Sequence, residues 1–152
     1  MISIVIPVYN EAKLIRGNIE IIHGILQKNA IPHEFVLVDD GSQDNSWVVL
    51  KQLVTDYPGQ VIRFSRNFGK EAALCAGLEA VRGAAAVIMD ADLQHPPEII
   101  PEMVRLWENG YEIVDGVKAS RGREKLSSRL FAQLFYDILE KLSGFDLHNA
   151  SD

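Results

Sequence analysis

The 152-residue sequence predicts an α/β domain built on a mostly parallel β-sheet with helices on both faces. Short apolar runs alternate with longer segments whose apolar residues recur at helical spacing, which is the pattern of βαβ units. Polar residues directly follow several of the apolar runs, as expected where parallel strands end at a ligand-binding edge. A chain of this length can bury one sizeable core. We expect residues 1–152 to be one catalytic domain or, because the chain stops soon after its last predicted helix, the N-terminal part of one.

The first βα unit is predicted at residues 2–28. A strand is expected at residues 2–7, where consecutive aliphatic residues indicate burial on both faces. Asn10 can cap a helix over residues 11–28, in which apolar residues recur every three or four positions.

Two further units follow with the same alternation. Strands are predicted at residues 35–38 and 61–64 because each is a short apolar run. Ser42 or Asp44 can cap the helix between them. A helix over residues 69–81 has small residues on its inner face, which would allow close packing against the sheet.

The last part of the chain begins with an apolar run at residues 84–89, which predicts a fully buried strand. Pro96 and Pro97 then start a helix that ends near Asn109, with Gly110 just beyond it. A fifth strand is predicted at residues 112–117, followed by a polar loop and a final helix over residues 126–142.

The composition excludes several classes of protein. The net charge of −6 argues against a nucleic-acid partner. No apolar run approaches the roughly 18 residues of a membrane span, and no signal peptide is evident. The single cysteine, Cys75, is expected to be a small buried residue in a reducing compartment. These features predict a cytoplasmic protein.

Two acids mark the end of the fourth apolar run. Asp90 and Asp92 are two residues apart, so in an extended segment their carboxylates point the same way. Adjacent carboxylates repel unless they share a proton or a cation. We favour a hard divalent ion, Mg²⁺ or Mn²⁺, held by oxygen ligands. The alternative is that both are solvated turn residues or that one caps the next helix.

Polar segments follow four of the predicted strands. They are residues 7–11, 39–44, 65–70 and 90–94. Because carboxyl ends of parallel strands share one edge of the sheet, the four segments are expected to form one pocket. Each alone has a simpler explanation, as a helix cap or a turn.

With these segments assembled, the chain resembles family 2 of the glycosyltransferases, which have the GT-A (Rossmann-like) fold. The matching motifs are residues 6–11 (IPVYNE), 38–42 (VDDGS), 66–70 (RNFGK) and 90–98 (DADLQHPPE). Within the family the chain looks most like the polyprenyl-phosphate sugar transferases, such as dolichyl-phosphate mannose synthase.

The resemblance implies an inverting hexosyltransferase that takes its sugar from a UDP- or GDP-linked donor. The implied nucleotide-sugar residues are Pro7, Tyr9, Glu11, Asp39, Asp40, Lys70 and Asp90. Asp39 would accept hydrogen bonds from the base or ribose. Asp90, Asp92 and Gln94 would surround the metal ion, which would stabilise the departing nucleotide diphosphate. Asp92, Lys118 and Arg129 are the implied catalytic residues.

The acceptor implied by the resemblance is an undecaprenyl or dolichyl phosphate. Basic residues gather between positions 117 and 130, and the resemblance favours Lys118, Arg121 and Arg129 as phosphate holders. Arginine and lysine are the expected partners of a phosphate. A phosphate is largely ionised near neutral pH and needs no strong general base. The alternative is a solvated basic loop.

The predicted helix over residues 126–142 has a wide apolar face that includes Phe131 and Phe135. This face fits core packing or a dimer contact, and it also fits peripheral contact with the cytoplasmic face of a membrane. Two other functions remain open from the sequence: a family 2 transferase that acts on a sugar hydroxyl, and a non-catalytic nucleotide-sugar-binding module.

Overall fold

The computed structural model describes residues 1–116, and the predictions made for residues 117–152 lie outside this range. The strands are β1 (Ile2–Val8), β2 (His33–Asp39), β3 (Gly59–Arg63) and β4 (Ala85–Ile88). The helices are α1 (Ile15–Lys28), α2 (Ser46–Asp56), α3 (Lys70–Glu79), the 3₁₀ turn η1 (Pro97–Ile99) and α4 (Ile100–Glu108).

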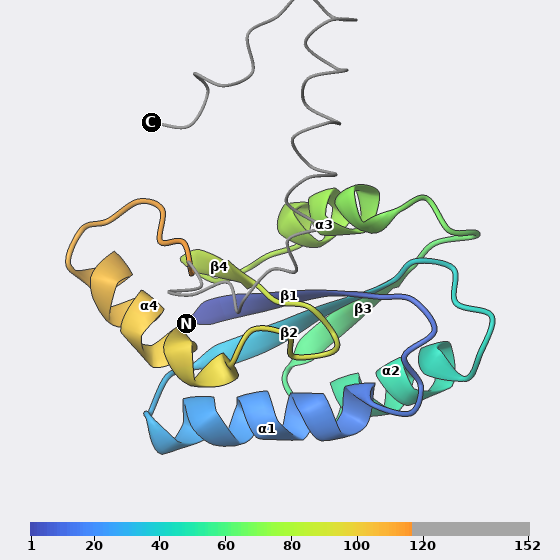
Figure 1. Ribbon diagram of the computed structural model, residues 1–152, viewed down its shortest axis with the longest axis horizontal. Coiled ribbons are helices and arrows are strands. Elements are labelled where there is room, and N and C mark those ends of the chain that lie inside the picture. Colours follow the sequence, from blue (N-terminus) through green and yellow to red (C-terminus); the bar gives the residue numbers. More distant parts are fainter. Residues whose placement is uncertain (117–152) are drawn as a thin grey trace, which may run out of the picture. The chain divides into compact units, whose positions relative to one another are not determined.

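The four strands form a parallel sheet in the order β3-β2-β1-β4. Helices α1 and α2 lie on one face of the sheet and α3 lies on the other (Figure 1). The predicted fold class is therefore confirmed. Because β2 and β4 flank β1 on opposite sides, the strand order reverses at β1, and the crevice beyond the carboxyl ends of β1 and β4 is where such sheets bind ligands.

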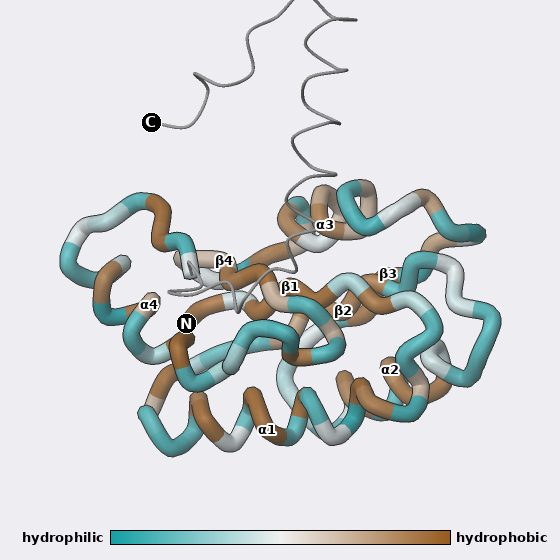
Figure 2. Tube along the Cα trace, in the orientation of Figure 1, coloured by the Kyte–Doolittle hydropathy of each residue, from teal (hydrophilic) through white to brown (hydrophobic). Residues whose placement is uncertain are grey.

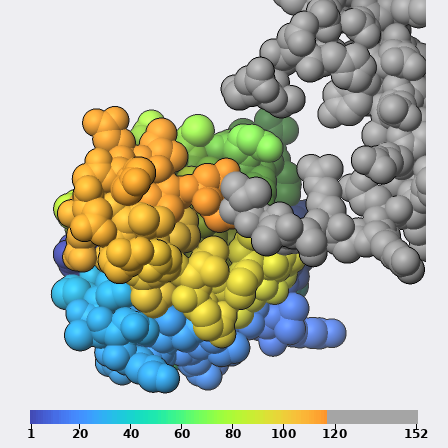
Figure 3. Space-filling view, turned by 60° about the vertical axis from the view of Figure 1, so that its left-hand side comes forward, coloured from blue at the N-terminus to red at the C-terminus, as the bar shows by residue number. Residues whose placement is uncertain are grey.

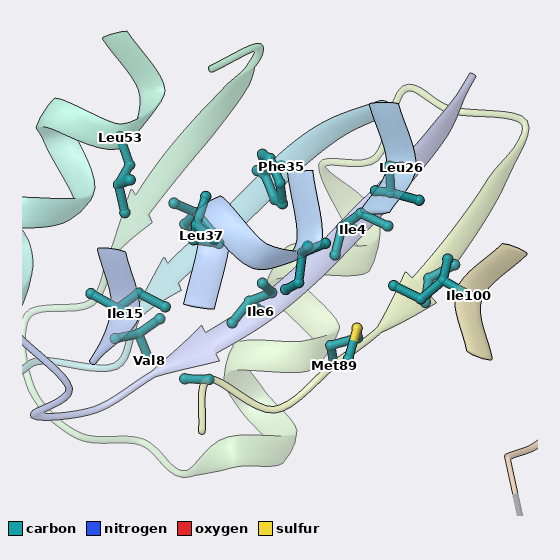
Figure 4. Close-up of a cluster of buried hydrophobic side chains, with 14 of the residues drawn as sticks. Ile4, Ile6, Val8, Ile15, Leu26, Phe35, Leu37, Leu53, Met89 and Ile100 are labelled. Atoms are coloured by element: carbon teal, nitrogen blue, oxygen red, sulfur yellow. The ribbon is translucent and has the colours of Figure 1, made fainter. Parts of the chain in front are cut away.

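The main core lies between the sheet and α1. Alternate residues of a strand face the same way, so β1 presents one row of aliphatic side chains to this layer. A matching stripe recurs along α1 at helical spacing. The residues of the two rows are Ile2, Ile4, Ile6 and Val8 in β1, and Ile15, Ile19, Ile22 and Leu26 in α1. Figure 4 shows this cluster, and Figure 2 shows that apolar residues concentrate along the strands and the inner side of α1.

Small residues on α3 allow it to pack closely against the opposite face, as the sequence predicted. A Cβ atom added to Gly77 would lie 3.3 Å from Val38 Cγ2 and would overlap the side chain of Val5. Cys75 was predicted to be buried, but it is exposed because it lies on the outer side of α3. Burial therefore extends along only one side of this helix.

The fourth strand is less buried than predicted. Val87 and Met89 are buried, but Ile88 is 49% exposed. The reason is its position: within residues 1–116, β4 is an edge strand that pairs with β1 alone. One of its faces contributes to the main core, and the other is open to solvent in the described part of the chain.

Two further predictions are wrong. The first helix begins at Ile15 and not at residue 11. Asn10, the predicted cap, has a left-handed backbone (φ 58°) and belongs to the loop before the helix. Residues 112–116 of the predicted fifth strand form no strand, and Ile113 is 88% exposed. A short segment with apolar residues forms a strand only where a neighbouring strand supplies hydrogen bonds. No helix among the described residues is long and apolar enough to cross a membrane.

Candidate functional site

A cavity of about 490 Å³ lies where the loops after the four strands converge. These loops lie at the same edge of the sheet, as Figure 1 shows for β1, β2 and β3. The cavity is lined by Pro7, Val8, Tyr9, Glu11, Asp40, Asn67, Gly69, Lys70, Asp90, Ala91, Asp92 and Gln94. The structure thus brings together in one cavity all of the described residues predicted for the site except Asp39.

The loops after β1 and β2 are joined by a set of hydrogen bonds. The Asn10 amide donates to Ser42 Oγ at 2.9 Å, and the Gln43 amide donates to Asn10 Oδ1 at 2.8 Å. The Glu11 amide donates to Ser46 Oγ at 2.8 Å. Asn10 and Ser42, predicted as helix caps, therefore bind the two loops to each other. This fixes the segment that carries Tyr9 and Glu11.

Asp44 adds a charged contact to the same junction. Its carboxylate accepts hydrogen bonds from the amide and hydroxyl of Ser46 and from the amide of Ala12. The slight loss of solvation on folding raises the pKa of Asp44, but these hydrogen bonds outweigh it and hold the pKa below its ordinary value. Asp44 thus accepts a hydrogen bond from Ser46, the first residue of α2, as a capping side chain would. The N-cap position itself is occupied by Asn45.

Asp40 connects the loop after β2 to the loop before α3. The residue is 3% exposed, and its two carboxylate oxygens accept hydrogen bonds from the amides of Phe68 at 2.7 Å and Gly69 at 3.0 Å. The next residue, Gly41, has φ 68° and packs against the backbone of Arg66. Asp40 therefore lines the cavity, but both of its carboxylate oxygens already accept hydrogen bonds from backbone amides of the protein.

Asp39 is fully buried and does not line this cavity. Its Oδ1 accepts a hydrogen bond from the Ser42 amide, and Oδ2 lies 3.2 Å from Arg63 Nε without a well-aligned hydrogen bond. Arg63 also lies 5.1 Å from the centre of the Trp47 ring. An adjoining hollow of about 620 Å³ is lined in part by Ser42 and Arg63, and Tyr9 borders both spaces.

Arg63 was not among the residues predicted for the site. The structure pairs it with Asp39 because the two residues are register partners at the ends of β3 and β2. The available signal was that Arg63 is a charged residue within the apolar run of a predicted parallel strand. The predicted acceptor residues Lys118, Arg121 and Arg129 lie outside the described part of the chain.

The acids after β4 are held differently from those after β2. Lys70 Nζ lies 2.5 Å from Asp90 Oδ1, so α3 supplies a cation to the first acid. Asp92 is exposed and accepts a hydrogen bond from the Gln94 side-chain amide at 2.8 Å. Leu93, which directly follows Asp92, has a left-handed conformation (φ 54°). Both carboxylates line the cavity.

The donor chemistry of this turn fits Mg²⁺ or Mn²⁺. Asp90, Asp92 and the amide oxygen of Gln94 offer the oxygen ligands that hard ions prefer. No group of three or more His, Cys, Asp or Glu residues suited to a metal occurs within residues 1–116. The remaining coordination positions would therefore have to come from a ligand or from water. Lys70 would compete with a bound ion for Asp90.

A family model and several known proteins are similar to this chain. The family model described as Glycosyl transferase family 2 matches residues 3–149. The uncharacterized glycosyltransferase YkcC of Bacillus subtilis (strain 168) is 38% identical over 146 residues, which cover 95% of this chain and 45% of YkcC. An undecaprenyl-phosphate 4-deoxy-4-formamido-L-arabinose transferase of Serratia proteamaculans (strain 568) is 40% identical over 123 residues, covering 79% of this chain and 37% of that protein.

A solved structure with a similar fold is the mannosyltransferase PcManGT from Pyrobaculum calidifontis in complex with GDP-Man and Mn²⁺. The TM-score is 0.58 at 25% sequence identity, and the match covers 68% of this chain and 31% of that one. The chain therefore spans less than half the length of each of these three proteins.

Proposed function

This chain belongs to glycosyl transferase family 2, and from that premise we propose that it transfers a sugar from a UDP- or GDP-linked donor to a polyprenyl phosphate. Transfer would require Mg²⁺ or Mn²⁺ and would proceed by a single in-line displacement, which inverts the anomeric centre. Residues 1–152 would belong to the catalytic domain, and the chain spans about 45% of its relative from Bacillus subtilis.

The observation that carries this proposal is the cavity that collects Asp90, Asp92 and Lys70 at the carboxyl edge of the sheet. A diphosphate carries several negative charges, and acids beside it would repel it unless a cation stood between them. A metal ion on Asp90, Asp92 and Gln94 would supply that charge and stabilise the departing nucleotide diphosphate. Lys70 would contact the diphosphate from the opposite side of the turn.

The nucleoside would occupy the part of the site formed by Pro7, Tyr9 and Glu11, which line the cavity. Asp39 Oδ2 is buried and lies 3.2 Å from Arg63 Nε without a well-aligned hydrogen bond, so it would accept a hydrogen bond from a base or ribose only if the partly exposed Arg63 side chain moved aside. Asp40 would shape the wall without contacting the donor, because both of its oxygens already accept backbone amides.

The acceptor assignment draws on the relatives. The Serratia proteamaculans relative is named for transfer to undecaprenyl phosphate. Lys118, Arg121 and Arg129 would hold the acceptor phosphate, whose ionised oxygen would attack the anomeric carbon while Asp92 keeps the leaving group in position. A lipid-linked acceptor would place the enzyme at the cytoplasmic face of a membrane.

Thermal unfolding of the 152-residue chain with donor candidates tests the first half of this proposal. A ligand that binds only the folded state stabilises it by about 2.7 kcal/mol at one hundred times its Kd. We expect a UDP- or GDP-sugar to raise the Tm strongly with Mn²⁺ and weakly without it. Asp92→Asn should remove the Mn²⁺-dependent part of the increase.

Asp56→Asn is the matched control, because Asp56 is exposed, pairs with Arg16 and lies outside the cavity. It should bind donor and Mn²⁺ as the wild type does. A Tm that no nucleotide sugar raises, or an increase that is equal with and without metal, would contradict the proposal.

A further inference from the structure

One residue of α1 contacts the metal turn from outside the cavity. The side-chain amide of Asn18 donates a hydrogen bond to the carbonyl oxygen of Ala91 at 2.6 Å. Ala91 lies between Asp90 and Asp92, and its carbonyl belongs to the peptide unit that leads into Asp92, so this bond holds the backbone between the two acids. We propose that Asn18 is a positioning residue for the metal- and diphosphate-binding turn, an inference that rests on the function proposed above.

Few polar contacts join the turn to the rest of the molecule, although Ala91 and Leu93 also pack against the main core. Within residues 1–116, residues 90–94 are joined to other elements by this hydrogen bond and by the Lys70–Asp90 ion pair. The contacts of Asp92 are to Gln94, inside the same turn. The hydrogen bond across the turn, from the Leu93 amide to the Asp90 carbonyl, is long at 3.3 Å. Among residues 1–116, Asn18 is therefore the one uncharged side chain that hydrogen-bonds this segment from another element.

The turn also has a reason to move if that restraint is lost. Leu93 has φ 54°, a conformation that costs a residue with a Cβ atom about 1–3 kcal/mol. Such a conformation persists only where surrounding contacts enforce it. Removal of the Asn18 bond would let the backbone relax, and the carboxylates of Asp90 and Asp92 would then no longer be held toward one point.

Asn18 is well placed to act as an anchor. Its neighbour Ile19 and the flanking Ile15 and Ile22 are fully buried in the main core, so this part of α1 is firmly fixed. The segment that follows β4 lies directly against the surface of α1 in the space-filling view, the former in yellow and the latter in blue (Figure 3). Asn18 thus ties the backbone of the turn to α1, in addition to the packing of Ala91 and Leu93 against the core.

The chemistry requires an amide at this position. The Asn18 nitrogen is a donor directed at a carbonyl acceptor, whereas aspartate would place one oxygen against another. Partners outside the coordination shell typically change metal affinity by about 10–100-fold when they are removed. We expect a loss of that size for Mn²⁺ when Asn18 is replaced, with little effect on nucleotide binding in the absence of metal.

The test is titration of the full 152-residue chain with Mn²⁺ in the presence of UDP, with free Mn²⁺ followed by electron paramagnetic resonance. Asn18→Asp should raise the apparent Kd for Mn²⁺ by about 10–100-fold and leave the Kd for UDP without metal unchanged. Asn18→His keeps a donor nitrogen near the same position and should recover part of the affinity. Asn18→Ala, which removes the donor without adding a charge, replaces Asn18→Asp if that variant does not fold and should show the same loss of Mn²⁺ affinity.

Asn29→Asp is the matched control. The Asn29 amide donates to the carbonyl of Ile25 at 2.8 Å near the end of the same helix, far along the chain from the site. The same substitution there should change neither Kd. An unchanged Mn²⁺ affinity in Asn18→Asp, or an equal loss in Asn29→Asp, would overturn the inference and leave the proposed function standing. Failure of the wild-type chain to bind Mn²⁺ would overturn both.

Discussion

The two sides of the cavity are built differently. On the side of β1, β2 and β3, the loops are joined to one another through Asn10, Asp40 and Asp44, which bond backbone amides of neighbouring loops. On the side of β4, the turn that carries Asp90 and Asp92 is attached to other elements by one hydrogen bond and one ion pair among the described residues. The first side, which we call the fixed wall, is held by hydrogen bonds between its loops. On the second side, the acids of the turn can still bind a ligand.

The acids on the two sides of the cavity differ in the groups that pair with their carboxylates. Asp40 is buried, and both of its oxygens accept hydrogen bonds from amides of the protein. Asp90 and Asp92 have partly or largely exposed side chains, and their partners Lys70 and Gln94 are side chains that can move aside. A carboxylate that is satisfied by backbone amides stabilises the fold, whereas one with a movable partner can bind a ligand. The same residue type therefore has a structural role on one side and a binding role on the other.

The largest effect is expected at Gly41, in the fixed wall. Its backbone is left-handed, and a Cβ atom there would lie 2.6 Å from Arg66 Cα. Gly41→Ala combines backbone strain with steric overlap and should reduce the free energy of unfolding by about 4 kcal/mol. Urea denaturation measures it. Gly24→Ala is the control, because nothing lies within 4 Å of a Cβ atom at Gly24 in α1, and it should stabilise by up to about 1 kcal/mol.

Asp40→Ala should have the next largest effect. It leaves the amides of Phe68 and Gly69 without their acceptor, which costs about 3 kcal/mol in the free energy of unfolding. Asp92→Ala removes an exposed acid from the other side and should change this quantity by less than about 1 kcal/mol. Equal losses in the two variants, measured by urea denaturation, would refute the division between a structural and a binding acid.

Lys70→Met should affect binding more than stability. The Lys70 side chain is 53% exposed, and an exposed ion pair contributes about 0–1 kcal/mol to folding. Loss of its charge should weaken metal-free UDP binding by about tenfold, the equivalent of one charge-assisted hydrogen bond. Mn²⁺ alone should bind more tightly, because its competitor for Asp90 is gone. Calorimetric titration separates the two effects, and weaker Mn²⁺ binding in this variant would contradict them.

The smallest effect concerns the acid dependence of the fixed wall. The pKa of Asp44 is lowered in the folded state, so the unfolded chain binds its proton first as the pH falls. The stabilisation by Asp44 is therefore fully present above the ordinary pKa of 3.8 and is lost as the pH falls through the lower folded value. The difference in unfolding free energy between wild type and Asp44→Asn should be constant from about pH 5 to 7 and shrink below about pH 4. A difference that persists at pH 2 would show that charge is not the cause.

The local pattern of apolar and polar residues was sufficient to predict most of the fold. The positions of β1, β2 and α1 follow from runs and stripes of aliphatic residues, and the gathering of four polar segments follows from the rule that parallel strands end at one edge. The pattern failed where an element depends on its neighbours. Ile88 was expected to be buried because it belongs to an apolar run, but β4 is the edge strand in the described part of the chain.

The site shows the same division. Asp90 and Asp92 could be predicted because both follow a strand and their spacing puts them on one side of the chain. Asn18 could not be predicted, since a single polar residue in an amphipathic helix gives no sign of a partner 73 positions away. Arg63 was missed for a similar reason, because its pairing with Asp39 depends on the register between β2 and β3.

The sequence by itself determined the class of fold, the family and the charged residues that line the cavity, because each of these depends on residue type, spacing and chain order. Only the tertiary structure decided which acids are committed to the protein's own amides and which remain available to a ligand. That distinction depends on burial and on hydrogen bonds between distant segments, and both arise only when the loops come together at the edge of the sheet.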